Sequence, residues 1–304
     1  MTDLKPLGPL DGPVYEVIDP RFAALTVAGG RAERLWTGGK WTEGPAWLAE
    51  GYLVWSDIPS NRLLRWDAAD NVVSLYRHPA ASANGNTVDR EGRLVTCEQH
   101  PRRIARTERD GTITALASHF DGRRFNSPND VVVKSDGTIW FTDPSYGVGG
   151  KGYEGTREMT GCHVYRADPA TGAVRQMTTD FHMPNGLAFS PDESLLYIVD
   201  TGATNFVGAP NHVRRFRVGP DGTLSGGEVL LNLAKLHDGL RVDADGRLWC
   251  ANEEGVHCHA PDGTLLGKLH LPERASNLTF GPEGWLLITA TTSLYRVPLS
   301  ARRP

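Results

Sequence analysis

The chain has 304 residues, with 34 glycines, 20 prolines and 39% hydrophobic residues, a composition typical of a turn-rich globular protein with ample material for a core. Its formal net charge of −4 is spread without charge blocks, which argues against nucleic acid or an anionic membrane as partner. No stretch approaches the roughly 20 apolar residues that a membrane-spanning helix needs.

The N-terminal stretch M-T-D-L-K-P-L-G-P-L-D-G has no apolar core behind a basic start. It therefore lacks the pattern of a secretory signal, and we expect a cytoplasmic protein. The four cysteines, Cys97, Cys162, Cys250 and Cys258, suit a reducing compartment. Cys250 and Cys258 flank one hairpin and are candidates for cross-strand neighbours, but we expect no disulfide, and no C-x-x-C spacing indicates a metal site.

The first predicted strand is A-E-R-L-W-T-G at residues 32–38, which precedes an internal repeat and has no unit of its own. Six times afterwards, an apolar run leads through a Gly/Asp turn into a second, alternating strand. These segments read E-G-P-A-W-L-A-E-G-Y-L-V-W, N-G-N-T-V-D-R-E-G-R-L-V-T, N-D-V-V-V-K-S-D-G-T-I-W, N-G-L-A-F-S-P-D-E-S-L-L-Y-I, D-G-L-R-V-D-A-D-G-R-L-W and S-N-L-T-F-G-P-E-G-W-L-L-I. A third strand such as R-L-L-R-W-D and a fourth such as N-V-V-S-L-Y complete most units.

Four short antiparallel strands per unit, six units and a period of very roughly 40 to 55 residues predict an all-β, six-bladed β-propeller. We expect one domain over residues 1–304, with residues 1–30 as an N-terminal extension that packs on the propeller. The last unit has no fourth strand. We therefore expect the strand at residues 32–38 to close the last blade, because this removes the exposed edge of an open ring.

One polar residue recurs eight places before the turn of every repeat. These ring residues are Glu43, Asn84, Asn129, Asn185, Asp238 and Ser276. Equivalent positions in a radial repeat converge on the axis, so the six side chains should face one another at one mouth of the channel. They supply only oxygen, which suits Ca²⁺, Mg²⁺ or Mn²⁺, and the two carboxylates would repel each other without a cation. Asn and Asp also favour turn entries, but that preference does not explain six polar residues in register.

Several motifs around the ring resemble the gluconolactonase/regucalcin (SMP-30-like) family, and among its members the bacterial sugar lactonases. They are W-T-E-G-P-A-W, N-S-P-N-D-V-V-V, W-F-T-D-P-S-Y-G, M-P-N-G-L-A-F-S-P-D and H-D-G-L-R-V-D, in order from about Glu43 to Tyr295. The resemblance implies a six-bladed propeller with one catalytic divalent cation on the axis. We expect Ca²⁺ first, with Zn²⁺, Mn²⁺ and Mg²⁺ as the other candidates.

The family's metal ligands fall on Glu43, Asn185 and Asp238, and the Asn of its N-D pair falls on Asn129, which would bind directly or through water. An arginine that some animal members place two residues before that Asn is Ser127 here. This departure puts their way of gripping sugar hydroxyls in question.

The resemblance implies a hydrolase that opens a sugar lactone, a small-molecule substrate, by attack of metal-activated water on the carbonyl carbon. Asp238 would accept a proton from the water, and Asn129 would help to hold the oxyanion. The residues expected to contact substrate are Asn84, His100, Asp130, Tyr146 and Ser276. The sequence leaves the oligomeric state open.

Two alternatives remain open: a phosphotriesterase-like hydrolase that uses the same ring, and a calcium-binding propeller without turnover. A scaffold would not need Glu43 and Asp238 to face an accessible channel. Hydrolysis by a Ser-His-Asp triad is disfavoured, because the chain has no G-x-S-x-G motif.

Overall fold

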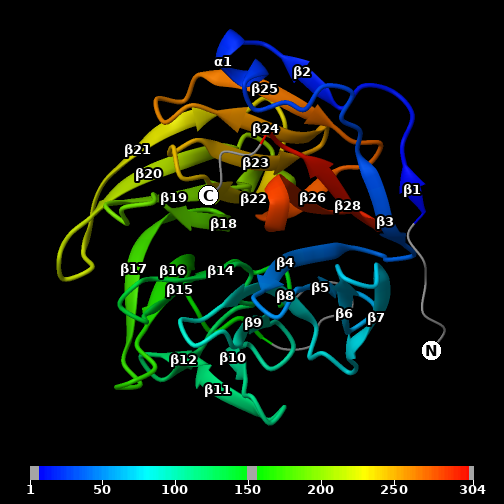
Figure 1. Ribbon diagram of the computed structural model, residues 1–304. Helices are drawn as coiled ribbons and strands as arrows, with labels where there is room; N and C mark the ends of the chain where they lie inside the picture. Colours follow the sequence, from blue (N-terminus) through cyan, green and yellow to red (C-terminus); the bar gives the residue numbers. More distant parts are fainter. Residues whose placement is uncertain (1–6, 149–155, 301–304) are drawn as a thin grey trace.

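The computed structural model describes residues 7–148 and 156–300. Six antiparallel sheets lie radially around a central axis, and Figure 1 shows their order in the run of colour from cyan through green and yellow to red. Each sheet contains the four strands of one blade. The predicted all-β, six-bladed propeller is confirmed.

Each blade runs from an inner strand at the axis to an outer strand at the rim. Blades 1 to 3 consist of β4 (Thr42–Leu48), β5 (Tyr52–Asp57), β6 (Arg62–Asp67) and β7 (Val72–Arg77); β8 (Ala83–Val88), β9 (Leu94–Glu98), β10 (Arg103–Thr107) and β11 (Ile113–Ala117); and β14 (Val131–Val133), β15 (Ile139–Asp143), β16 (Cys162–Ala167) and β17 (Val174–Phe181).

Blades 4 to 6 consist of β18 (Pro184–Phe189), β19 (Leu195–Asp200), β20 (His212–Val218) and β21 (Leu224–Asn232); β22 (His237–Val242), β23 (Leu248–Asn252), β24 (Gly255–His259) and β25 (Leu265–His270); and β26 (Ala275–Phe280), β27 (Trp285–Ala290), β28 (Ser293–Pro298) and β3 (Glu33–Thr37). The smaller elements are β1 (Gly8–Pro9), β2 (Tyr15–Val17), α1 (Pro20–Ala23), β12 (His119–Phe120), β13 (Arg123–Arg124), η1 (Gly202–Thr204) and η2 (Pro282–Gly284).

The turn between the first and second strands of blade 3 shows why the repeat is so regular. Gly137 has φ +82°, in the left-handed region that favours glycine. The Asp136 carboxylate accepts a hydrogen bond from the amide of Thr138 at 3.0 Å, which fixes the turn. An Asp-Gly pair therefore marks the hairpin that places the ring residue at the far end of the inner strand.

The core is divided among the interfaces between blades. The described residues form six buried hydrophobic clusters, and each joins two neighbouring blades. In the interface between blades 6 and 1, the rings of Trp36 and Trp55 lie 5.7 Å apart in an edge-to-face arrangement. Because every blade packs on two others, the inner strands are held in a fixed circle.

The N-terminal strand closes the ring, as expected from the sequence. β3 pairs with β28 in antiparallel register, with Ser293 opposite Thr37 and Leu294 opposite Trp36. Figure 1 shows this pairing as a blue strand beside a red one. The inner strands β26 and β4 also contact each other, so the first and last blades meet.

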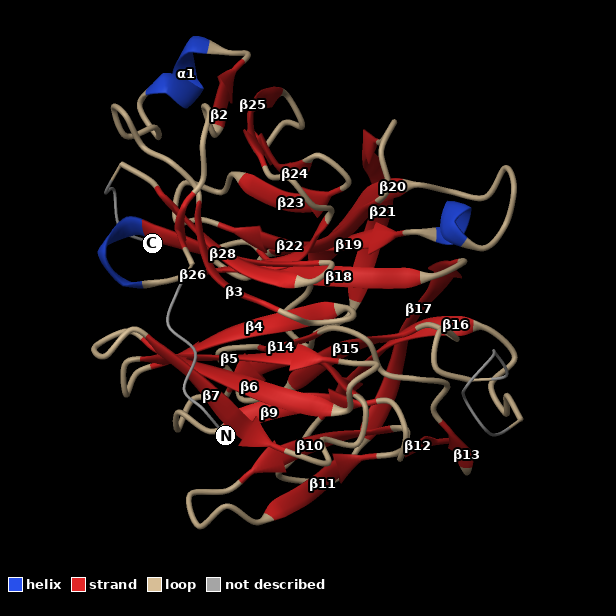
Figure 2. Ribbon diagram, turned by 90° about the vertical axis from the view of Figure 1, so that its right-hand side faces the viewer, coloured by secondary structure: helices blue, strands red, loops and turns tan. Residues whose placement is uncertain are grey.

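Described residues that precede β3 pack on blades 5 and 6. β1 pairs with β3, β2 pairs with β25, and the buried Phe22 of α1 lies 6.1 Å from the Trp249 ring. Figure 2 shows α1 at the outer edge, next to β2 and β25. Among residues 7–148 and 156–300, no helix has the length and hydrophobicity to cross a membrane.

All four cysteines are buried and free. Cys250 lies opposite His257, and Cys258 lies opposite Trp249. The two thiols therefore occupy opposite faces of blade 5, because neighbouring residues of a strand alternate in direction. The expectation that they are cross-strand neighbours was wrong by one residue in register.

Candidate active site and metal centre

Ring residues from five blades line one cavity of about 390 Å³, which we call the axial cavity. These five are Glu43, Asn84, Asn129, Asn185 and Asp238. Polar and aromatic side chains that also line it are Trp41, Gln99, Tyr146, Thr204 and Arg274. The structure thus brings together every residue that the sequence assigned to the metal.

Hydrogen bonds from backbone amides to aspartate side chains fix the segments that lead into the ring residues. In blades 1, 3 and 4, the aspartate that ends the second strand accepts amide hydrogen bonds from residues just before the ring residue. The bonds join Asp57 to Lys40 (3.0 Å) and Trp41 (3.4 Å), Asp143 to Asn126 (2.7 Å), and Asp200 to His182 (2.8 Å) and Met183 (2.9 Å). These carboxylates hold the ring residues in place without lining the axial cavity.

A glycine follows the ring residue in four blades, and each lies close to the next blade. A Cβ on Gly85 would lie 2.5 Å from the carbonyl oxygen of Asn129, and a Cβ on Gly186 would lie 2.5 Å from that of Asp238. Real Cβ atoms are not found so close to another heavy atom. The inner strands can therefore approach this closely only because these positions carry no side chain.

In blades 3 and 6, Asp130 and Asn277 take the place of this glycine. The Asn277 amide donates to Asp130 Oδ2 at 3.3 Å and to Glu43 Oε2 at 3.1 Å. The Asn277 amide thus links Asp130 to Glu43 across the axis and holds one oxygen of Glu43, which also accepts from the Gly44 amide at 2.6 Å.

The carboxylates of the site strongly perturb one another. Burial raises the pKa of Glu43 well above its ordinary value, and the nearby charges of Asp238 and Asp130 raise it further. Burial also raises the pKa of Asp238 to about 6, although Arg274 opposes this shift. The Arg274 guanidinium lies 3.4 Å from Asp238, and that of Arg241 lies 3.5 Å from Asp130.

The donor set fits a hard divalent cation. Asn84 Oδ1 is buried and has no hydrogen-bond partner among the described residues. The Asn185 amide nitrogen donates to Thr201 Oγ1 at 3.2 Å, which leaves its oxygen for another partner. Two crowded carboxylates and amide oxygens on one cavity wall are the ligands that Ca²⁺ and Mg²⁺ prefer.

Of the residues expected to contact substrate, Asn84 and Tyr146 line the axial cavity, and the Tyr146 hydroxyl lies 2.8 Å from Thr201 Oγ1. The other three do not line it. His100 is exposed, whereas its neighbour Gln99 lines the cavity. Asp130 is buried beside the cavity, where its carboxylate accepts from the Asn277 amide.

Ser276 is fully buried, and its hydroxyl donates to the Thr42 carbonyl at 2.5 Å and lies 3.0 Å from Thr289 Oγ1. A short side chain that is used in this way does not reach the axial cavity. The sixth ring position is therefore a packing contact between blades 6 and 1.

Arg274 and Trp41 were not predicted from the sequence, although they lie two residues before the ring residues Ser276 and Glu43. The Arg274 guanidinium lies over the Trp41 ring, 5.2 Å from its centroid. Ser127 occupies the equivalent position in blade 3, two residues before the ring residue Asn129. Blade 6 thus carries, at Arg274, the kind of residue that is missing at Ser127 in blade 3. The position two residues before the ring residue, compared in all six repeats, is the sequence signal for Arg274.

A family model described as "SMP-30/Gluconolactonase/LRE-like region" matches residues 41–292. The chain belongs to this family. The match begins two residues before Glu43 and ends in the turn before β28, so it spans every ring residue.

Several relatives are similar over most of the chain. A gluconolactonase of Zymomonas mobilis is 29% identical over 91% of this chain and 84% of the relative. A pentonolactonase of Haloferax volcanii is 30% identical over 79% of this chain and 77% of the relative. The solved structure of a gluconolactonase from Xanthomonas campestris superimposes with a TM-score of 0.90 at 36% identity, over 98% of this chain and 99% of that one. The class expected from the sequence, a gluconolactonase-like ester hydrolase, agrees with these relatives.

Proposed function

We propose that this protein is a metal-dependent hydrolase that opens sugar lactones at the axial cavity. The observation that supports this most is the convergence of Glu43, Asn129, Asn185 and Asp238 on one cavity, with two carboxylates whose pKa values are raised by burial. The relatives named gluconolactonase and pentonolactonase support a five- or six-carbon aldonolactone as the substrate class.

These four residues would hold the cation, with Ca²⁺ as the first candidate and Asn129 bound directly or through water. When bound, the cation supplies Lewis-acid chemistry to the lactone carbonyl and to water. The remaining work falls to the side chains around it.

Asp238 is the proposed proton acceptor. Its pKa of about 6 lies near neutral pH, where a general base combines a high ionised fraction with useful basicity. Arg274 keeps the carboxylate oriented through its contact at 3.4 Å. Asp238 would take a proton from the water that adds to the carbonyl carbon.

Asn129 is proposed to donate its amide to the carbonyl oxygen as that atom gains negative charge. The ring oxygen then leaves as the carbon–oxygen bond breaks, and it takes up the proton held by Asp238. The product is a ring-opened hydroxy acid, which releases one proton at neutral pH.

The rest of the axial cavity suits a polyhydroxylated ring. Gln99, Tyr146 and Arg274 offer hydrogen-bond donors or acceptors, and Trp41 offers an apolar face against which a sugar ring can stack. A cavity of about 390 Å³ has room for such a small ligand.

The test is proton release from glucono-1,5-lactone and from a pentonolactone, corrected for spontaneous hydrolysis. It compares protein treated with a chelator with the same protein after addition of Ca²⁺, Mn²⁺, Mg²⁺ or Zn²⁺. We expect metal-dependent acceleration in the wild type, and its loss in Glu43→Gln. No acceleration of any aldonolactone with any of these metals would overturn the proposal, and cleavage of an aryl phosphotriester instead would favour the phosphotriesterase alternative.

A further inference from the structure

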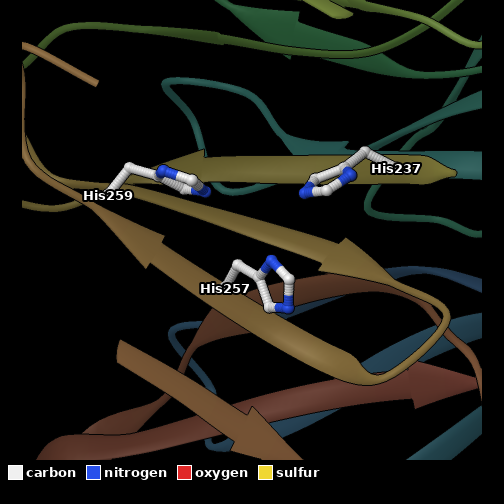
Figure 3. Close-up of side chains that lie close together, drawn as sticks. All are labelled: His237, His257 and His259. Carbon is white, nitrogen blue, oxygen red and sulfur yellow. The ribbon is translucent and has the colours of Figure 1, made fainter. Parts of the chain in front are cut away.

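Three buried histidines of blade 5 lie close together, outside the axial cavity. His237 begins β22, and His257 and His259 lie on β24. One ring nitrogen from each lies within 4.8 Å of the corresponding atoms of the other two. Figure 3 shows the three imidazoles pointing toward one another.

The cluster lies between blades 4 and 5. His257 is opposite Cys250, and directly opposite residues of an antiparallel pair share a face of the sheet. Cys250 belongs to the hydrophobic cluster that blade 5 shares with Tyr197 and Val213 of blade 4. The histidines are therefore covered by protein, with exposed fractions of 1% for His237, 8% for His257 and 6% for His259.

Hydrogen bonds fix which nitrogen of each ring carries the proton. His237 Nδ1 donates to the Lys235 carbonyl at 2.8 Å, and His259 Nδ1 donates to the Gly263 carbonyl at 3.2 Å. His257 Nε2 donates to the Glu254 carboxylate at 3.1 Å. Each acceptor is an oxygen without a hydrogen, so the other nitrogen of each neutral imidazole carries a lone pair.

Two of the three lone pairs meet no donor in the described part of the chain. His237 Nε2 and His259 Nε2 are buried and have no hydrogen-bond partner among the described residues. One water molecule has only two hydrogens and cannot satisfy three acceptors. Burial disfavours a charged imidazole, and the neutral ring is the form that binds a metal.

We propose that His237, His257 and His259 form a second metal site, for Zn²⁺, distinct from the axial cation site. Three imidazole nitrogens favour Zn²⁺ over the hard cations that suit the axial oxygens. The bonds to Lys235, Gly263 and Glu254 orient the rings, as outer carboxylates and carbonyls do in zinc proteins. A tetrahedral ion needs nitrogen separations of about 3.4 Å, which small ring rotations would supply.

The bound ion ties β24 to the start of β22 across β23. Because His237 directly precedes Asp238, the ion also fixes the backbone that carries this ring residue. The site is thus a structural support of blade 5 that lies beside the axial cavity.

The test uses tag-free protein with Glu43→Gln, which weakens the axial site while leaving the histidines intact. Zinc uptake is measured by metal analysis after equilibrium dialysis, and the ligand shell by X-ray absorption. We expect one Zn²⁺ per chain, a shell with imidazole nitrogens at about 2.0 Å, and a rise of several degrees in the melting temperature.

In the same background, His259→Gln removes a ligand and Glu254→Gln weakens its support. Loss of an outer-shell partner typically lowers affinity about 10–100-fold, so Glu254→Gln should fall in this range and His259→Gln should lose at least as much. Glu254 is partly exposed, so its variant remains informative if the buried histidine variant fails to fold. His163→Gln is the matched control, since His163 is a histidine of 8% exposure in blade 3 and should leave zinc affinity unchanged.

Two results would overturn the proposal. One is an absence of zinc uptake, or a zinc shell made of oxygen alone, in the Glu43→Gln protein. The other is zinc affinity in His259→Gln and Glu254→Gln equal to that of the His163→Gln control.

Discussion

Two opposing effects act on the pKa of the buried Asp238 carboxyl. Burial favours the neutral acid, whereas the Arg274 guanidinium favours the carboxylate, and the result is a pKa raised to about 6. Glu43 shares the same cavity and also has a raised pKa. The metal-free site is therefore electrostatically unfavourable, and a cation between these groups would relieve it.

We expect Asp238→Asn to lower kcat by about 10²–10⁴-fold, the usual cost of losing a general base. Asparagine keeps an oxygen for the cation, so metal affinity should fall less than turnover does. The measurement is kcat at saturating metal, with the metal dissociation constant determined in parallel. A kcat near that of the wild type under these conditions would mean that Asp238 is a ligand only.

Stability without metal should depend on pH through Asp238. The folded-state pKa is about 6, above the ordinary 3.8, so between these values the folded protein binds more protons than the unfolded chain. The contribution of Asp238 to stability is therefore lost as pH rises from about 4 to 6. In Asp238→Asn this loss is absent.

The measurement is the free energy of unfolding of both proteins in a chelator, at pH 4 and pH 7. From pH 4 to pH 7, we expect the free energy of unfolding of the variant to rise relative to that of the wild type by up to about 3 kcal/mol. The raised pKa of Asp143, about 7, affects both proteins alike and cancels in the difference. The pKa of Glu43 does not cancel, because the charge of Asp238 helps to raise it, and its fall in the variant adds to the gain in the same direction. A difference that is the same at both pH values would contradict a raised pKa of Asp238.

At the scale of elements, the inner strands are spaced by the glycines that follow the ring residues. Gly44 has φ +54°, and a Cβ there would lie 2.7 Å from the amide nitrogen of Asn86 in the next blade. Gly137 also has a positive φ, +82°, but its Cβ would meet nothing within 4 Å. The two positions thus differ in steric surroundings and share an unfavourable backbone conformation for alanine.

We expect Gly44→Ala to destabilise the protein by about 1–3 kcal/mol more than Gly137→Ala, the usual cost of overpacking. Both variants bear the backbone penalty, so the difference isolates the contact between blades 1 and 2. Urea unfolding measures it. Equal losses in the two variants would show that the inner strands can move apart at no cost.

The sequence predicted the elements well because the repeat carries strong local signals. Alternating strands and Asp-Gly turns gave the blades, and the fixed distance to the turn gave Glu43, Asn185 and Asp238. Ser276 lies at the same distance from its turn, but this position alone does not reveal that its hydroxyl donates to the Thr42 carbonyl and not into the cavity.

The histidine cluster could not be predicted in the same way. His237 and His257 lie on strands that both pair with β23, and it is the register of these two pairings that brings them together. Their spacing in the sequence matches no metal-binding motif. An error of one residue in register changes the face of the sheet on which a side chain lies. A register error of one residue also explains why Cys250 and Cys258 were expected to be cross-strand neighbours although they lie on opposite faces of the sheet.

At the scale of the whole molecule, stability depends on the closing strand. We expect deletion of residues 1–37 to expose the edge of β28 and to cause aggregation or a large fall in melting temperature. Deletion of residues 1–30 is the control, since it removes α1, β1 and β2 but keeps β3. A 1–37 deletion that melts like the 1–30 deletion would show that β3 contributes little to closure.

The pairing of β3 with β28 also sets when the molecule can finish folding. Arg34 and Tyr295, which lie opposite each other in these strands, are 261 residues apart in the chain. At about 5–20 residues per second, a ribosome needs roughly 13–50 s to make the second after the first. β3 waits without its partner for that whole time, while five blades form beside it. The circle of blades can therefore close only after β28 has been made, so ring closure comes late in folding.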